Sequence, residues 1–172
     1  VAGLAAFGGG TLREILLDRR PFFWVENSYW LWLLVGLCVL GSFFMKRQHV
    51  ELTEKAIQIP DALGLGLFTT LGTQIALQHE MPLIVAVLMG VVTAVFGGVL
   101  RDIVCNEIPR VFSDHRPNAI LGFMGGFVLV GLLSVGVFEL LAVSISFVLI
   151  TVLRLLAIYK DWKLPKWQGL SD

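Results

Sequence analysis

Two short segments of this chain combine residue types that could pass or bind an ion. The segment "FGGVLRDIVCNEIP", residues 96–109, has two adjacent glycines followed by an arginine and an aspartate, and "GGGTLREILLDRRP", residues 8–21, repeats the arrangement. Glycine weakens a helix and lets another backbone or an ion come close. A charge inside an apolar segment must face a protein interior, a water-filled cavity or the interface. Together these residues predict interrupted helices that line a polar path.

The candidate site residues fall into three groups. An adjacent carboxylate points about 100° away from its arginine on a helix, so we expect it to pair with another helix. Glycines that serve only close packing, and arginines that snorkel, are the alternative interpretation. The candidates are Gly8, Gly9, Gly10, Gly97 and Gly98 for the interruptions, Arg13, Glu14, Arg101 and Asp102 for lining or gating, and Thr73, Gln74 and Asp61 for lining or packing.

The remaining chemistry of the chain argues against an enzyme. Cys38 and Cys105 lack metal-ligand spacing, and the three histidines are far apart in the sequence. No Ser–His–Asp, HExxH or P-loop pattern occurs. Net charge is zero, so no basic field favours nucleic acid. We therefore expect no catalytic residue, no metal and no cofactor, although a bound lipid is a further candidate ligand.

The composition predicts an all-α integral membrane protein. The chain has 172 residues, 56% of them hydrophobic and 15% charged, and its mean hydropathy is +0.82. A helix needs about 20 apolar residues to cross a bilayer, and strands of a barrel would alternate apolar and polar residues. Pro60 and Pro82 suit helix starts, and Asp61 suits an N-cap. The expected spans are residues 1–17, 29–45, 61–78, 82–105, 118–138 and 139–159.

Small residues predict where two of these helices pack. Ala62, Gly66, Thr69, Thr73 and Ala76 form a stripe on the third expected span, for which packing is favoured over ion coordination. A GxxxG pair at Gly122 and Gly126 has the same interpretation.

Basic residues predict the orientation of the chain. Lys and Arg gather in loop 46–59, in loop 106–117 and in the tail 160–172, which share one side if the spans are counted in order. The positive-inside rule then places the C-terminus in the cytoplasm. Arg19 and Arg20 lie on the opposite side, as part of the first glycine segment. Arg154, near the end of the last span, is expected to snorkel.

The two glycine segments indicate an internal repeat. A shift of 88 residues superposes Gly9, Gly10, Leu12, Arg13, Ile15 and Pro21 on identical residues of the second segment. The shift crosses three spans, an odd number, so the second copy is inverted, as in many transporters. The units of this single transmembrane domain, 1–172, are the rest of repeat one (1–48), repeat two (60–138), a final helix (139–159) and a tail (160–172). A first helix is expected to be missing, which makes seven spans in the intact protein.

Three segments resemble a known family. "GGGTLREILLDRRPFFW", "DALGLGLFTTLGTQIAL" and "FGGVLRDIVCNEIPRVF" are similar to the prokaryotic relatives of the trimeric intracellular cation (TRIC) channels, also known as a glycine-transporter domain. The resemblance implies two inverted three-helix repeats plus a last helix, a homotrimer with a pore in each protomer, and permeation of K⁺ and Na⁺ across a prokaryotic inner or plasma membrane. This chain departs from the family pattern in one respect: the third glycine of its first segment has no counterpart in its second segment. A secondary transporter for a small solute such as glycine, and a non-conducting scaffold, are the alternatives.

Overall fold

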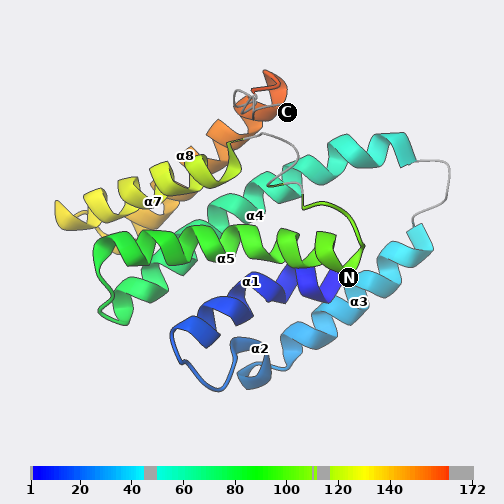
Figure 1. Ribbon diagram of the computed structural model, residues 1–172, viewed down its shortest axis with the longest axis horizontal. Helices are drawn as coiled ribbons and strands as arrows, with labels where there is room; N and C mark the ends of the chain where they lie inside the picture. The colour runs from blue at the N-terminus through cyan, green and yellow to red at the C-terminus, as the bar shows by residue number, and fades with distance from the viewer. Residues whose placement is uncertain (1, 45–49, 110, 112–116, 163–172) are drawn as a thin grey trace, which may run out of the picture.

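The computed structural model describes residues 2–44, 50–109, 111 and 117–162, and this part of the chain is helical without strands. The prediction of an all-α fold is confirmed. The helices are α1 (Ala2–Leu16), α2 (Phe23–Glu26), α3 (Tyr29–Phe44), α4 (Val50–Gln78), α5 (Leu83–Val104), α7 (Asn118–Ser134) and α8 (Glu139–Tyr159), as Figure 1 shows.

The long helices run in alternating directions along the longest axis of the molecule (Figure 1). Helices α4, α5, α7 and α8 pack together as a bundle, α1 packs along α5, and α3 lies at the edge against α1 and α2. Helix α1 is therefore antiparallel to α5, its counterpart under the 88-residue shift. This is the relative direction that an odd number of intervening spans requires.

The outside of the bundle is apolar. Helix α3 exposes Trp32, Leu33, Leu37 and Leu40, each more than half exposed. Among the described residues, α5 and α8 are long and apolar enough to cross a membrane, and residues 29–41 and 118–134 form shorter apolar helices. An exposed surface of this kind is stable in contact with lipid and costly in contact with water.

Helix α4 begins earlier than the sequence predicts. It runs from Val50 through Pro60, so Pro60 does not start the helix and Asp61 is not an N-cap. A proline in a helix interior removes one backbone hydrogen bond and costs about 3 kcal/mol. The packing of α4 against α5, α7 and α8 offsets that cost, because tertiary contacts contribute more to helix stability than local propensity does.

Small residues bring the bundle helices into close contact. In the α4 stripe, Ala62, Thr69 and Ala76 are fully buried, and a methyl group built on Gly66 would lie 2.6 Å from the hydroxyl of Thr151 on α8. A methyl group on Gly126 of α7 would lie 2.8 Å from Val87 on α5. The stripe on α4 and the GxxxG pair on α7 thus pack helices within this chain.

Candidate functional site

The glycines of the two segments lie where α1 crosses α5. A methyl group built on Gly9 would lie 1.9 Å from the carbonyl oxygen of Thr93, and one on Gly8 would lie 3.7 Å from Cα of Gly97. Only glycine permits this approach of two backbones. Gly9 and Gly97 correspond under the 88-residue shift, so the two copies of the motif meet each other at this crossing.

Neither glycine segment interrupts its helix. Helix α1 continues from Ala2 to Leu16 and α5 from Leu83 to Val104, so the prediction of broken helices is wrong. Glycine costs a helix interior only about 1 kcal/mol relative to alanine, and the close contact between α1 and α5 compensates for that loss. Close packing, the alternative left open by the sequence, is what these glycines provide at the crossing.

A cavity of about 370 Å³ lies beside the crossing, between α1, α4 and α5. We call it the polar cavity, because two charged side chains contribute to its wall, together with the backbone of five glycines. It therefore collects residues from both copies of the motif and from the helix that precedes the second copy. The wall consists of Ala6, Gly9, Gly10, Pro60, Asp61, Gly64, Leu65, Phe68, Thr93, Ala94, Gly97, Gly98 and Arg101.

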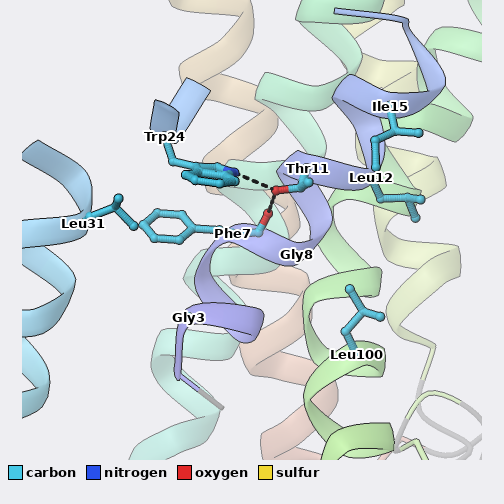
Figure 2. Close-up of a pocket in the computed structure, with 9 residues that line it drawn as sticks. All are labelled: Gly3, Phe7, Gly8, Thr11, Leu12, Ile15, Trp24, Leu31 and Leu100. Carbon is cyan, nitrogen blue, oxygen red and sulfur yellow. Dashed lines mark hydrogen bonds between the residues drawn. The ribbon is translucent and has the colours of Figure 1, made fainter. Parts of the chain in front are cut away.

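A second cavity, of about 410 Å³, lies on a different face of α1 and reaches α3 and α5 (Figure 2). We call it the apolar cavity. Beside it, the indole N–H of Trp24 donates a hydrogen bond of 3.1 Å to the Thr11 hydroxyl, which itself donates to the carbonyl oxygen of Phe7. These bonds fix α2 to α1. The wall consists of Gly3, Phe7, Gly8, Thr11, Leu12, Ile15, Trp24, Leu31 and Leu100.

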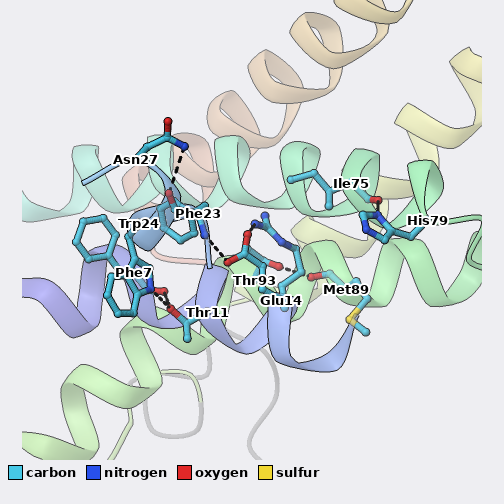
Figure 3. A network of polar contacts seen from close by, with 11 residues as sticks. Phe7, Thr11, Glu14, Phe23, Trp24, Asn27, Ile75, His79, Met89 and Thr93 are labelled. Carbon is cyan, nitrogen blue, oxygen red and sulfur yellow. Dashed lines mark hydrogen bonds and ion pairs between the residues drawn. The ribbon is translucent and has the colours of Figure 1, made fainter. Parts of the chain in front are cut away.

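Figure 3 shows the charged end of α1 beneath α2. Glu14 is fully buried and accepts a 2.9 Å hydrogen bond from the backbone N–H of Phe23. Its second oxygen lies 3.4 Å from Nη2 of Arg13, which is also buried. The Phe23 ring closes over Gly10, where a methyl group would lie 2.9 Å from it. Phe23 therefore covers both the carboxylate and the last glycine of the first copy.

The charged end of α5 is more open. Nη2 of Arg101 lies 2.8 Å from the Asp102 carboxylate, whose side chain is buried, while the Arg101 side chain remains 28% exposed and lines the polar cavity. Arg13 and Arg101 each contact the adjacent carboxylate, contrary to expectation, while Glu14 also accepts a hydrogen bond from another helix, α2. A long guanidinium side chain can turn back to its neighbour, and a buried carboxylate is stable only with a donor nearby.

Arg154 is the functional candidate that sequence reasoning missed. It does not snorkel: only 4% of its side chain is exposed, and its Nη2 lies 3.5 Å from the Asp61 carboxylate of α4. The Asp61 side chain is 48% exposed and lines the polar cavity. The last helix, which lies outside the repeats, thus holds a carboxylate at the cavity wall. The signal in the sequence was an arginine within an expected membrane-spanning segment, because a charge in such a segment is a functional candidate by default.

Two other candidates lie away from the polar cavity. Thr73 is fully buried against the glycines Gly90 of α5 and Gly126 of α7. Gln74 donates a hydrogen bond to the Glu139 carboxylate at the start of α8. Both residues join helices, and neither contributes to the wall of the polar cavity.

Comparison with known proteins agrees with this architecture. The chain matches the family model described as Glycine transporter over residues 1–46 and 58–134. It is 33% identical to a UPF0126 membrane protein of Vibrio cholerae over 67% of this chain and 48% of that protein. It is 35% identical to the UPF0126 inner membrane protein YadS of Escherichia coli K12 over 65% of this chain and 54% of that protein. The chain spans about half the length of these curated relatives.

Two solved structures share the fold over most of their length. The TRIC trimeric intracellular cation channel orthologue from Rhodobacter sphaeroides superposes with a TM-score of 0.83 at 31% identity, covering 92% of this chain and 80% of that one. A second TRIC cation channel, solved to explain conductance, superposes with a TM-score of 0.86 at 30% identity over 99% of this chain and 83% of its own. By sequence, fold and the paired glycine–arginine segments at its central crossing, this chain belongs to the prokaryotic TRIC and glycine-transporter family of membrane proteins.

Proposed function

We propose that this protein is a channel for monovalent cations, chiefly K⁺ and Na⁺, with a path through each protomer along the α1–α5 crossing. The observation that carries the proposal is the polar cavity at that crossing, where the Asp61 carboxylate is half exposed between three helices. The half-exposed Asp61 carboxylate places negative charge at the cavity wall, and such a charge raises the local concentration of cations. The solved relatives named as TRIC cation channels support this function.

The arginines of the polar cavity do not oppose a cation path. Arg101 is paired with Asp102, and Arg154 with Asp61. Each positive charge near the cavity therefore has a carboxylate within 4 Å, so the local field is close to neutral rather than positive. Of these four charged side chains, that of Asp61 is the most exposed. We assign Asp61 the role of attracting the cation.

Phe23 covers the first glycine segment at the α2 end. Phe23 lies over Gly10 and caps Glu14, and Arg13 and Glu14 are both buried. The polar cavity receives residues from the other end of α5, around Arg101. We propose that α2 is the gate and that conduction requires Phe23 to leave Gly10.

Recording from the purified protein in a lipid bilayer tests the channel. We expect discrete unitary currents in symmetric KCl, smaller in NaCl, and reduced in Asp61→Asn. Leu63→Ala, an exposed residue of the same helix, serves as the matched control. The absence of unitary currents from a folded, correctly assembled protein would contradict the proposal.

A secondary transporter for glycine is the second candidate, and one observation favours it. The polar cavity holds a carboxylate, Asp61, and a guanidinium, Arg101, which together match the ammonium and carboxylate of a zwitterionic amino acid. Uptake of labelled glycine into proteoliposomes separates the candidates. Saturable uptake driven by an ion gradient, without unitary currents, indicates the transporter, and neither activity leaves a membrane scaffold.

We further propose that the protein is a homotrimer with its C-terminus in the cytoplasm. The trimer rests on the relative from Rhodobacter sphaeroides, whose name describes it as trimeric, and the orientation on the basic loops. Light scattering of the detergent-solubilised protein, corrected for bound detergent, tests the trimer. A mass of one or two chains would contradict it.

A further inference from the structure

The apolar cavity opens on the outer surface of the bundle. Its wall contains no charged residue, and two of its wall residues, Ile15 on α1 and Leu31 on α3, are 52% and 37% exposed. Figure 2 shows Phe7 and Leu31 directed toward each other across one end and Leu12 above Leu100 at the other. A cavity of this kind excludes water and accepts a hydrocarbon group from the surrounding membrane.

A basic cluster lies next to this cavity. The guanidinium carbon of Arg20 lies 5.7 Å from the centre of the Phe22 ring, and the Phe22 ring stacks on Trp24 with 6.0 Å between the centres. Trp24 belongs to the cavity wall, so the Arg20 guanidinium is connected to the cavity through the rings of Phe22 and Trp24. Arg19 precedes Arg20 in the same turn of chain.

The two arginines are available for an anion. Among the described residues, neither Arg19 nor Arg20 has a carboxylate within 4.0 Å, although Asp18 and Glu26 are exposed nearby. Arginine binds phosphate oxygens in a bidentate manner. The site therefore has the order of a phospholipid in a membrane: the apolar cavity corresponds to the acyl chain, the aromatic pair to the interface, and the two arginines to the headgroup.

We propose that this site binds an anionic phospholipid, with an acyl chain in the apolar cavity and its phosphate at Arg19 and Arg20. Charge complementarity selects the headgroup. An acyl chain is narrow enough to enter a cavity of about 410 Å³, whereas a helix with its side chains is about 10 Å across. The proposal does not depend on what passes through the polar cavity.

The site is placed to influence the α1–α5 crossing. Gly8 and Leu100 belong to the wall of the apolar cavity, and a methyl group on Gly8 would lie 2.8 Å from Leu100. An acyl chain in the cavity therefore contacts both helices beside the point where Gly9 meets Thr93. The lipid stabilises this crossing and, through Trp24, the position of α2.

Native mass spectrometry of the purified full chain tests the site with two lipids that share the same acyl chains, phosphatidylglycerol and phosphatidylcholine. We expect the wild type to retain phosphatidylglycerol at least tenfold more strongly. Arg19→Gln with Arg20→Gln, which weakens the headgroup site, and Gly3→Leu, which fills the cavity, each lose this preference. The controls Lys160→Gln and Gly36→Leu retain it, because Lys160 is exposed in the α8 C-cap and Gly36 has no atom within 4 Å of a built methyl group.

Three results would overturn the proposal. The first is equal retention of both lipids by the wild type, and the second is unchanged retention by the two site variants. The third is an oligomer that dissociates in Gly3→Leu while lipid binding stays unchanged. That result would assign the cavity to contacts between subunits. If Gly3→Leu fails to fold, a variant that keeps only Trp24 among the five tryptophans replaces it. Phosphatidylglycerol with brominated acyl chains then quenches Trp24 fluorescence in detergent, and no quenching beyond that by brominated phosphatidylcholine contradicts the site.

Discussion

Arg101, like Asp61, is a charged residue that is partly exposed and lines the polar cavity. It is paired with the buried Asp102, yet its side chain is 28% exposed and lines the polar cavity. Arg13 has the same neighbour relation but is buried under α2. The two copies of one motif thus differ in accessibility: α2 folds back over the first copy, whereas Arg101 of the second copy lines the polar cavity.

Replacing Arg101 with alanine is expected to raise unitary K⁺ conductance by about twofold or more at low salt, because the path loses a positive charge and the local cation concentration rises. The effect shrinks at high salt as screening increases. Bilayer recording at two KCl concentrations measures it, with Lys160→Ala as the control. Unchanged currents from an intact oligomer would make Arg101 an anchor only.

Replacing Gly9 with alanine is expected to destabilise the protein by about 1–3 kcal/mol, the usual cost of overpacking. The added methyl group would lie 1.9 Å from the Thr93 carbonyl oxygen, and a backbone atom cannot move aside alone. The matched control is Gly36→Ala on α3, where no atom lies within 4 Å. Denaturant titration in detergent gives both free energies of unfolding, and equal values would show that the crossing is loose.

At the scale of elements, α2 is a short helix with a large effect on the site. It contributes the Phe23 N–H to Glu14, the Phe23 ring to Gly10 and the Trp24 indole to Thr11. Phe7 also packs edge-on against the Phe23 ring, with 5.5 Å between the centres. A four-residue helix has little stability of its own, so its position depends on these contacts with α1.

Replacing Phe23 with alanine is expected to raise the open probability about tenfold, provided that the ring contributes on the order of 1.4 kcal/mol to the closed state. The backbone N–H still donates to Glu14, so the variant isolates the ring. Val25→Ala, in the same helix and half exposed, is the control. Single-channel recording measures the open probability. If it falls or stays the same, α2 is not the gate.

At the scale of the whole molecule, the alternating helix directions bring charged residues of three helices to one end of the bundle. Asp61, Arg101 and Arg154 come from three helices and gather at the end of the bundle where α5 and α8 finish. The basic loops predict that this end faces the cytoplasm. Cys105, which follows α5 and is exposed, reports on the same end.

Labelling of Cys105 tests the orientation. In a Cys38→Ser variant, a membrane-impermeant maleimide is expected to react with Cys105 only when applied from the cytoplasmic side. The control is Glu80→Cys in a chain without the two native cysteines, since the turn between α4 and α5 lies at the opposite end and reacts from the outside. Reaction of Cys105 from the outside would reverse the predicted topology.

Much of the helical architecture could be predicted because it depends on local composition. The expected span 139–159 is α8 residue for residue, and 82–105 differs from α5 by one residue at each end. The start of α4 could not be predicted from Pro60, because distant packing outweighs the local cost of proline. The same holds for the glycine segments, which looked like breaks and are continuous helices.

The sequence by itself determined that the chain is a helical membrane protein with two copies of a glycine–arginine motif running in opposite directions, since hydropathy and repetition are properties of the chain. The tertiary structure alone decided which carboxylate each arginine contacts. Arg154 meets Asp61 across 93 positions of sequence, whereas Arg13 and Arg101 turn back to their immediate neighbours. A buried charge takes the nearest partner in space, and distance in space is set only when the helices pack.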